Sequence, residues 1–225
     1  MSKKVLFVSV HPDDETLGCG GTILKHKKEG DQVSWLIITA PTKDHPYGFS
    51  HEMIDKRELE IQEVASLYGF DKTTQLGFPT QMLDEINLRD LVMSIDKAIN
   101  NVQPEIIYFI NRSDIHSDHR IAFQAIYACT KNFRKPFIEE LLMYETLSET
   151  EFAPALGEAV FMPNVFVDIT DFMQRKLEIM SIYATEVMPD NLPRSLSAIN
   201  ALATYRGSRI GVKFAEAFMM IFKKR

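Results

Sequence analysis

The sequence is poor in cysteine and has no long hydrophobic run. Its only cysteines, Cys19 and Cys129, lie far apart and cannot form a disulfide framework, so we expect a reducing compartment such as the cytoplasm. No apolar stretch approaches the ~20 residues that a membrane-spanning helix needs. The N-terminal apolar run is short, meets acidic residues and has no small-residue cleavage site, which argues against a signal peptide.

Positive charge is also in deficit. The chain has 25 lysines and arginines against 31 acidic residues, a formal net charge of −6. Nucleic-acid binders present basic surfaces to phosphates, so we expect no nucleic-acid partner, and an anionic membrane surface is equally disfavoured. The composition is otherwise that of a globular protein, with no repeat, low-complexity segment or linker. We therefore expect one domain over residues 1–225.

Segments with strand and helix patterns alternate along the chain. Apolar runs predict strands at 4–10, 32–39, 73–78, 104–110, 140–145 and 164–169. Helical patterns end at Gly30 and Gly69 and cover 87–101, 120–133, 172–185 and 193–207. The apolar stretch 210–218 fits either a cover over the core or an oligomer interface. The alternation predicts an α/β fold, a Rossmann-like three-layer sandwich with a mostly parallel central sheet.

Two stretches rich in histidine and acidic residues follow strands of this predicted sheet. "HPDDE" (11–15) comes after the first strand, and "NRSDIHSDH" (111–119) comes after the strand 104–110. Ligand sites of parallel α/β sheets lie at the carboxyl ends of the strands. We therefore expect the two stretches to meet in space, although they are far apart in the sequence.

The residue types in these stretches predict a metal centre. His11 and Asp14 are three positions apart and can converge on one ion at a tight turn, while His116 and His119 share one face of a helical turn. A His/Asp/His set with open coordination positions is typical of catalytic zinc, which lowers the pKa of its bound water to roughly 7. Asp13 is then available as a general base, and His116 is available to stabilise an oxyanion.

Each stretch by itself has a simpler interpretation. Acidic residues after a strand can open a helix, where they favour its dipole, and an HxxH pair is often a surface pair. The combination favours the metal, because three of the six histidines fall at two strand ends beside acids. The glycines of "GCGGT" (18–22) suggest a dinucleotide fingerprint, but Ile23 stands where its third glycine belongs. We expect these glycines to let a helix pack closely on the sheet.

With these motifs the sequence resembles the LmbE-like, or PIG-L, family of zinc-dependent N-deacetylases. The resemblance rests on "HPDDE", "HSDH", "RELEIQEVASLYG" (57–69) and "YRGSRIGVKFAEAF" (205–218), which span nearly the whole chain. The site residues that it implies are His11, Asp14 and His119 as zinc ligands, Asp13, His116 and Asp118 as catalytic residues, and Arg57 at the substrate.

The roles that the resemblance implies are specific. Asp13 would be the general base, His116 would polarise the carbonyl or hold the oxyanion, and Asp118 would orient His116. Two positions depart from the family pattern: Ser117 replaces a proline of the second motif, and Thr80 stands where many members carry an aspartate near the substrate. The change at Ser117 is mild and should leave the turn intact. Thr80, together with a loop after the second strand that lacks the family's frequent glycine-rich form, lies where the substrate is read and weakens the transfer of substrate identity, while the metal chemistry is untouched.

The function implied is hydrolysis of an amide, most simply N-deacetylation of an N-acetylglucosamine-type sugar or sugar conjugate. One alternative is an amidase that acts on another acylated amine, such as an antibiotic or a thiol conjugate. A second alternative is a metal-binding or nucleotide-binding module without turnover. Oligomers are common in the family, so a homo-oligomer is a further expectation.

Overall fold

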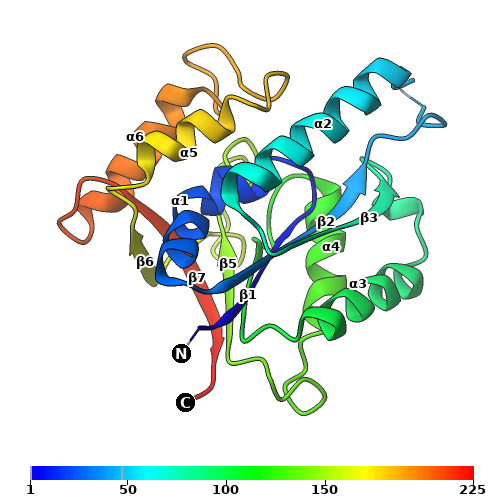
Figure 1. The fold of residues 1–225 in the computed structure, drawn as a ribbon, viewed down its shortest axis with the longest axis horizontal. Coiled ribbons are helices and arrows are strands. Elements are labelled where there is room, and N and C mark those ends of the chain that lie inside the picture. Colours follow the sequence, from blue (N-terminus) through cyan, green and yellow to red (C-terminus); the bar gives the residue numbers. More distant parts are fainter. Residues whose placement is uncertain (1, 47) are drawn as a thin grey trace.

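The computed structural model describes residues 2–46 and 48–225, and a seven-stranded sheet forms its middle layer (Figure 1). The strands are β1 Lys4–Ser9, β2 Gln32–Ala40, β3 Lys72–Pro79, β4 Ile106–Ile110, β5 Glu140–Tyr144, β6 Val165–Asp168 and β7 Ala215–Lys223. The helices are α1 Asp14–Glu29, α2 His51–Tyr68, α3 Leu88–Val102, α4 Ser117–Ala128, α5 Met173–Met180 and α6 Leu196–Ser208, with a 3₁₀ turn at Leu83–Glu85.

The strand order is β3-β2-β1-β4-β5-β7-β6. The pairs from β3 to β5 are all parallel, whereas β7 runs antiparallel to both of its neighbours, β5 and β6. The described sheet is therefore mostly parallel, and the predicted fold class is confirmed.

Helices cover both faces of the sheet (Figure 1). In one layer α1 contacts α2 and α5, and α5 contacts α6; α3 and α4 pack together in the other layer. The continuous apolar runs of the central strands follow from this arrangement, because both faces of a strand such as β4 are buried. Every residue of β4 is in the core.

The glycines near the start of α1 allow it to lie close to its neighbours, as expected. A Cβ atom on Gly18 would lie 2.3 Å from the Tyr144 ring, and one on Gly21 would lie 2.6 Å from Ile169. A larger residue at either position would force the helix away from the sheet. The glycines therefore serve packing, which removes the main support for the nucleotide interpretation.

The last third of the chain differs from the expectation. Strand β7, residues 215–223, lies inside the sheet. Its first four residues are the end of the apolar stretch 210–218. These four residues therefore belong to the core layer rather than to a cover or an interface. Helix α5 ends at Met180, five residues earlier than expected. Helix α4 begins at Ser117, earlier than the predicted 120, because the His116 side chain caps its first turn.

Strand β7 also anchors α1 through a buried ion pair. The Glu216 carboxylate accepts the backbone N–H groups of Gly21 at 2.9 Å and Thr22 at 2.8 Å. Lys176 of α5 donates to the same carboxylate at 2.7 Å and to the carbonyl of Leu17 at 2.8 Å. The described C-terminal strand therefore fixes the position of the helix that begins at Asp14.

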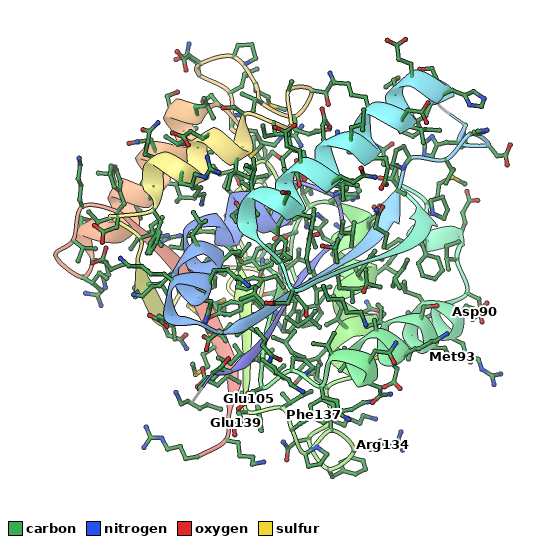
Figure 2. All side chains as sticks on the ribbon, in the orientation of Figure 1. Asp90, Met93, Glu105, Arg134, Phe137 and Glu139 are labelled. Carbon is green, nitrogen blue, oxygen red and sulfur yellow. The ribbon has the colours of Figure 1, made fainter. Side chains whose placement is uncertain are left out.

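The chain reverses its direction of travel across the sheet between β1 and β4. Strands β2 and β3 are added on one side of β1, and β4 and β5 on the other. The loops that follow β1 and β4 consequently leave the sheet side by side, at the crevice where open α/β sheets bind ligands. Glu105 and Glu139 precede β4 and β5 at the opposite edge (Figure 2).

Candidate metal centre

The two stretches predicted to meet do so at the carboxyl edge of the sheet. Asp14 is the first residue of α1, and its Oδ2 accepts the N–H groups of Val10 at 2.9 Å and His11 at 2.8 Å. These bonds fix the turn after β1. The other carboxylate oxygen, Oδ1, lies 3.5 Å from Nε2 of His119, which the first turn of α4 supplies.

His11, Asp14 and His119 form a compact cluster, with one potential ligand atom of each within 4.8 Å of the others. Nε2 of His119 lies 3.3 Å from Nδ1 of His11. Ligand atoms at ~2.1 Å from a tetrahedral zinc are about 3.4 Å from one another, so the cluster has the dimensions of such a site. Two imidazoles and one carboxylate are also a usual donor set for zinc.

Each histidine of the cluster has a carboxylate on its other nitrogen. His119 donates its Nδ1 proton to Oδ2 of Asp114 at 2.9 Å, and His11 donates its Nε2 proton to Oδ2 of Asp118 at 3.1 Å. A carboxylate can only accept, so in the neutral form of each ring the nitrogen that is free to bind a metal faces the cluster. Partners of this kind orient metal-binding histidines and raise their basicity.

The electrostatics of the cluster favour a cation. Burial disfavours the charged form of His119, but Asp14 and Asp114 outweigh burial and raise the pKa of His119 to about 9. In the absence of a metal the site therefore stabilises a proton, and positive charge is what the surrounding carboxylates select. The residues present fit a divalent metal ion.

Asp118 has partners that the sequence did not indicate. Its Oδ2 accepts the N–H of Gln81 at 2.6 Å as well as the His11 proton, and its Oδ1 accepts the N–H of Leu83 at 3.1 Å. Burial acts to raise its pKa, but these hydrogen bonds outweigh burial and lower the pKa of Asp118. The carboxylate contacts His11, while His116 is reached only by the backbone N–H of Asp118.

His116 is the N-cap of α4 and lies beside the cluster. Its Nδ1 accepts the N–H of Asp118 at 3.1 Å. Burial, together with the neighbouring imidazoles of His11 and His119, lowers the pKa of His116 to about 4. The ring is therefore neutral at pH 7, and its single proton is on Nε2, because Nδ1 is an acceptor. His116 lines the pocket described below as a hydrogen-bond donor.

Asp13 occupies a strained position between two predicted ligands. Its φ of 137° and ψ of −28° are rare for a residue with a side chain, and such strain is typical of functional sites. Burial raises the pKa of Asp13 well above its usual value, and the charges of Asp14 and Glu186 raise it further, against Arg194. The carboxyl group is therefore a good proton acceptor in the pocket.

A cavity of about 480 Å³ opens above these residues. Its floor is formed by the cluster with Asp13 and His116, and its walls include Phe49, Thr80 and Glu149. Thr80, one of the two positions that depart from the family pattern, therefore lies in the wall of the pocket. Tyr47, the other aromatic residue of the loop before α2, lies outside the described residues.

Arg57 lies in the wall of the pocket and contacts the segment after α5. It donates to Oε1 of Glu186 and, at 3.1 Å, to Oγ1 of Thr185. Arg194, from the same segment, lies 3.3 Å from Oε2 of Glu186 and 3.5 Å from Oδ2 of Asp13. Sequence reasoning missed Glu186 and Arg194. Glu186 lies between two helical patterns, and Arg194 falls at the start of the pattern 193–207, where no motif marks it as a site residue.

Asp114 was also missed, although a signal for it was present. It belongs to the quoted stretch "NRSDIHSDH", but five positions separate it from His119 and the spacing suggested no contact. An acidic residue beside a histidine motif, at the end of a buried strand, is the signal that would have identified it.

The fold and the site are those of a candidate metal-dependent hydrolase. The sheet is mostly parallel, and its carboxyl edge carries a His/Asp/His cluster, a buried carboxyl group and a pocket. The chain belongs to the PIG-L family: residues 6–130 match the family model described as GlcNAc-PI de-N-acetylase. That match covers more than half of the chain and includes both histidine motifs. The predicted family is confirmed.

The chain is similar to proteins named as deacetylases over most of its length. It is 27% identical to a diacetylchitobiose deacetylase from Thermococcus kodakarensis, covering 97% of this chain and 83% of that protein. It is 25% identical to a probable N-acetyl-alpha-D-glucosaminyl L-malate deacetylase 2 from Bacillus cereus, covering 83% and 84%. The structure of N,N'-diacetylchitobiose deacetylase from Pyrococcus horikoshii matches with a TM-score of 0.75 and 26% identity, covering 98% and 84%.

The sequence predicts that no segment forms a membrane-spanning helix, and the lengths of the described helices can be compared with that expectation. None of them, over residues 2–46 and 48–225, has both the length and the apolar character needed to span a bilayer.

Proposed function

We propose that the protein is a zinc-dependent N-deacetylase that hydrolyses the acetamide of an N-acetylglucosamine-type sugar or sugar conjugate. The observation that carries the proposal is the His11, Asp14 and His119 cluster, with a carboxylate behind each histidine and with Asp13 and His116 at the same pocket. Membership of the PIG-L family and the deacetylase names of the relatives support the reaction.

Zinc held by His11, Asp14 and His119 would supply a Lewis acid that acidifies water and polarises the amide carbonyl. The remaining chemistry belongs to the chain. Asp13 removes a proton from the attacking water, which its raised proton affinity favours. The water oxygen bonds to the carbonyl carbon, and the Nε2 proton of His116 forms a hydrogen bond to the resulting oxyanion.

The second half of the reaction returns the proton. The C–N bond breaks as Asp13 gives its proton to the nitrogen of the leaving amine, so one water is consumed and acetate and the free amine are released. Asp118 and Asp114 act through the histidines that they orient. We assign Asp118 to the positioning of His11, where its carboxylate lies, rather than to the orientation of His116.

The size and lining of the pocket suit a small molecule. A cavity of about 480 Å³ can hold one sugar ring and part of a neighbouring group. Arg57 and Phe49 line its wall and are available to contact the ring. We assign residues 1–225 to one deacetylase domain. The two free thiols support a location in the cytoplasm. The homo-oligomer stays a prediction.

The test is acetate release from N,N'-diacetylchitobiose and methyl N-acetylglucosaminide by metal-stripped protein, with and without added Zn²⁺. We expect zinc-dependent release, and about one zinc per chain. In Asp13→Asn, release should fall by ~10²–10⁴-fold while zinc stays bound, because a general base is lost and the ligands are kept. Loss of zinc from this variant would make Asp13 a ligand, and failure to bind zinc at all would overturn the metal centre.

A further inference from the structure

Three side chains at the outer wall of the pocket form an ion-pair clamp: Arg57 of α2, and Glu186 and Arg194 of the segment between α5 and α6. Glu186 joins the two arginines, with Oε1 on Nη2 of Arg57 and Oε2 at 3.3 Å from Nη1 of Arg194. All three side chains are at least three-quarters buried, with exposed fractions of 14%, 23% and 23%. Ion pairs that are shielded to this degree are weakly screened by salt.

Each arginine of the clamp also faces a second carboxylate. Nη1 of Arg57 lies 3.4 Å from Oε2 of Glu60, and Nη1 of Arg194 lies 3.5 Å from Oδ2 of Asp13. Two guanidinium groups are therefore shared among three carboxylates. The charge of each arginine is therefore offset by carboxylates of the wall, and an anionic ligand would compete with Glu186 for both guanidinium groups.

The other charged groups of the pocket wall do not alter this balance. Lys56 is half exposed and lies 4.0 Å from Glu60, and Glu149 adds a further negative charge on the wall. A substrate with a carboxylate or phosphate beyond its acetamido sugar would have to displace Glu186 or lie beside it. Juxtaposed like charges reject a ligand more strongly than a lost contact does.

We propose that Glu186 determines the specificity of the pocket, by neutralising Arg57 and Arg194 and so selecting N-acetylated sugars whose attached group carries no negative charge. This inference rests on the proposed function and names its substrate class. The names of the relatives mention two kinds of substrate, an uncharged disaccharide and a sugar joined to malate, and the inference predicts that this pocket prefers the first kind.

The experiment compares kcat/KM for N,N'-diacetylchitobiose with that for N-acetyl-α-D-glucosaminyl L-malate. We expect wild-type protein to favour the uncharged disaccharide by at least about tenfold. Glu186→Gln should raise the ratio of kcat/KM for the malate conjugate to kcat/KM for the disaccharide about tenfold, because both arginines become available while any effect on Asp13 is shared by the two substrates. Glu186→Asp keeps the charge and should keep the preference. Glu140→Gln, which removes an ion-paired carboxylate near Lys223, is the matched control and should change neither value.

A binding measurement separates this inference from the proposed function. Calorimetry on metal-free protein, in which no ion can attract the anion, compares the malate conjugate with methyl N-acetyl-α-D-glucosaminide. Tighter binding of the uncharged glycoside, reversed in Glu186→Gln, supports the inference even if no substrate is hydrolysed. A wild-type preference for the malate conjugate, or an unchanged ratio in a folded Glu186→Gln protein, overturns it. If Glu186→Gln does not fold, the wild-type ratio alone decides.

Discussion

Nδ1 of His119 lies 2.9 Å from Oδ2 of Asp114, and both side chains are fully buried. Asp114 lies behind His119, one of the predicted metal ligands, and controls which nitrogen of His119 faces the other two. In Asp114→Asn we expect zinc affinity to fall by ~10–100-fold, measured by competition with a chelating dye, because an oriented and basic ligand is lost.

Asp31→Asn is the control for this prediction. Asp31 contacts Nδ1 of His26 at 2.7 Å, so it is also a histidine-bound carboxylate, but it follows α1 at the opposite edge of the sheet. Asp31, His26 and Glu29 also form a group that could hold a metal ion, but the substitution should leave the zinc affinity of the His11, Asp14 and His119 site unchanged. Equal losses in the two variants would mean that Asp114 acts on stability rather than on the metal centre.

His116 has two functions that substitution can separate. Asparagine is a good N-cap residue, so His116→Asn should keep the stability of the protein within ~0.5 kcal/mol of wild type. Turnover should nevertheless fall by ~10²–10³-fold, because the Nε2 donor is removed. His116→Ala should lose turnover and also ~1 kcal/mol of stability. Urea unfolding and acetate release measure the two effects, and full activity in His116→Asn would contradict the assigned donor.

Gly18 tests how closely α1 packs on the sheet. A methyl group there would lie 2.3 Å from the ring of Tyr144, so Gly18→Ala should reduce the free energy of unfolding by ~1–3 kcal/mol. Gly157 has open space around its Cβ position, and Gly157→Ala should change stability by less than ~0.5 kcal/mol. Urea titration compares the two, and equal stabilities would show that the helix can shift at no cost.

The two thiols should react slowly until the pH is high. Burial raises the pKa of Cys129 to about 11 and raises that of Cys19 well above its usual value. A thiol of pKa 11 has only about one thiolate per thousand molecules at pH 8, and the thiolate is the reactive form. Alkylation followed by mass spectrometry should be slow at pH 8, faster for Cys129 as the pH approaches 11, and fast for both in urea. Rapid native labelling at pH 8 would contradict the burial of Cys129.

The sequence allowed prediction of the parallel sheet and of the meeting of the two motifs. Strands buried on both faces leave continuous apolar runs, and parallel strands place their carboxyl ends at one edge, so local patterns were sufficient. Strand β7 was missed although "AFMMIF" (217–222) is an apolar run of strand length, because the buried Glu216 near its start interrupts the pattern. Glu216 can be buried because it forms an ion pair with Lys176 and accepts hydrogen bonds from the backbone of α1. These contacts are tertiary, so no local sequence pattern indicates them.

The outer half of the site was less predictable for the same reason. Glu186 and Arg194 reach the pocket through the packing of α5 against α1 and of α6 against α5, a tertiary arrangement without a local signature. The family resemblance implies that Asp118 orients His116, but it does not indicate the contact of the Asp118 carboxylate with His11, which depends on how the turn of α4 meets the turn after β1.

The hydrogen bonds between Glu216 and α1 make the position of the metal centre depend on the last strand of the sheet. Asp14 opens the helix whose backbone Glu216 secures, and the bonds cross from one terminal region of the protein to the other. A premature stop or a proteolytic cut that removed β7 would spare every residue of the metal centre and still loosen the helix on which it is built.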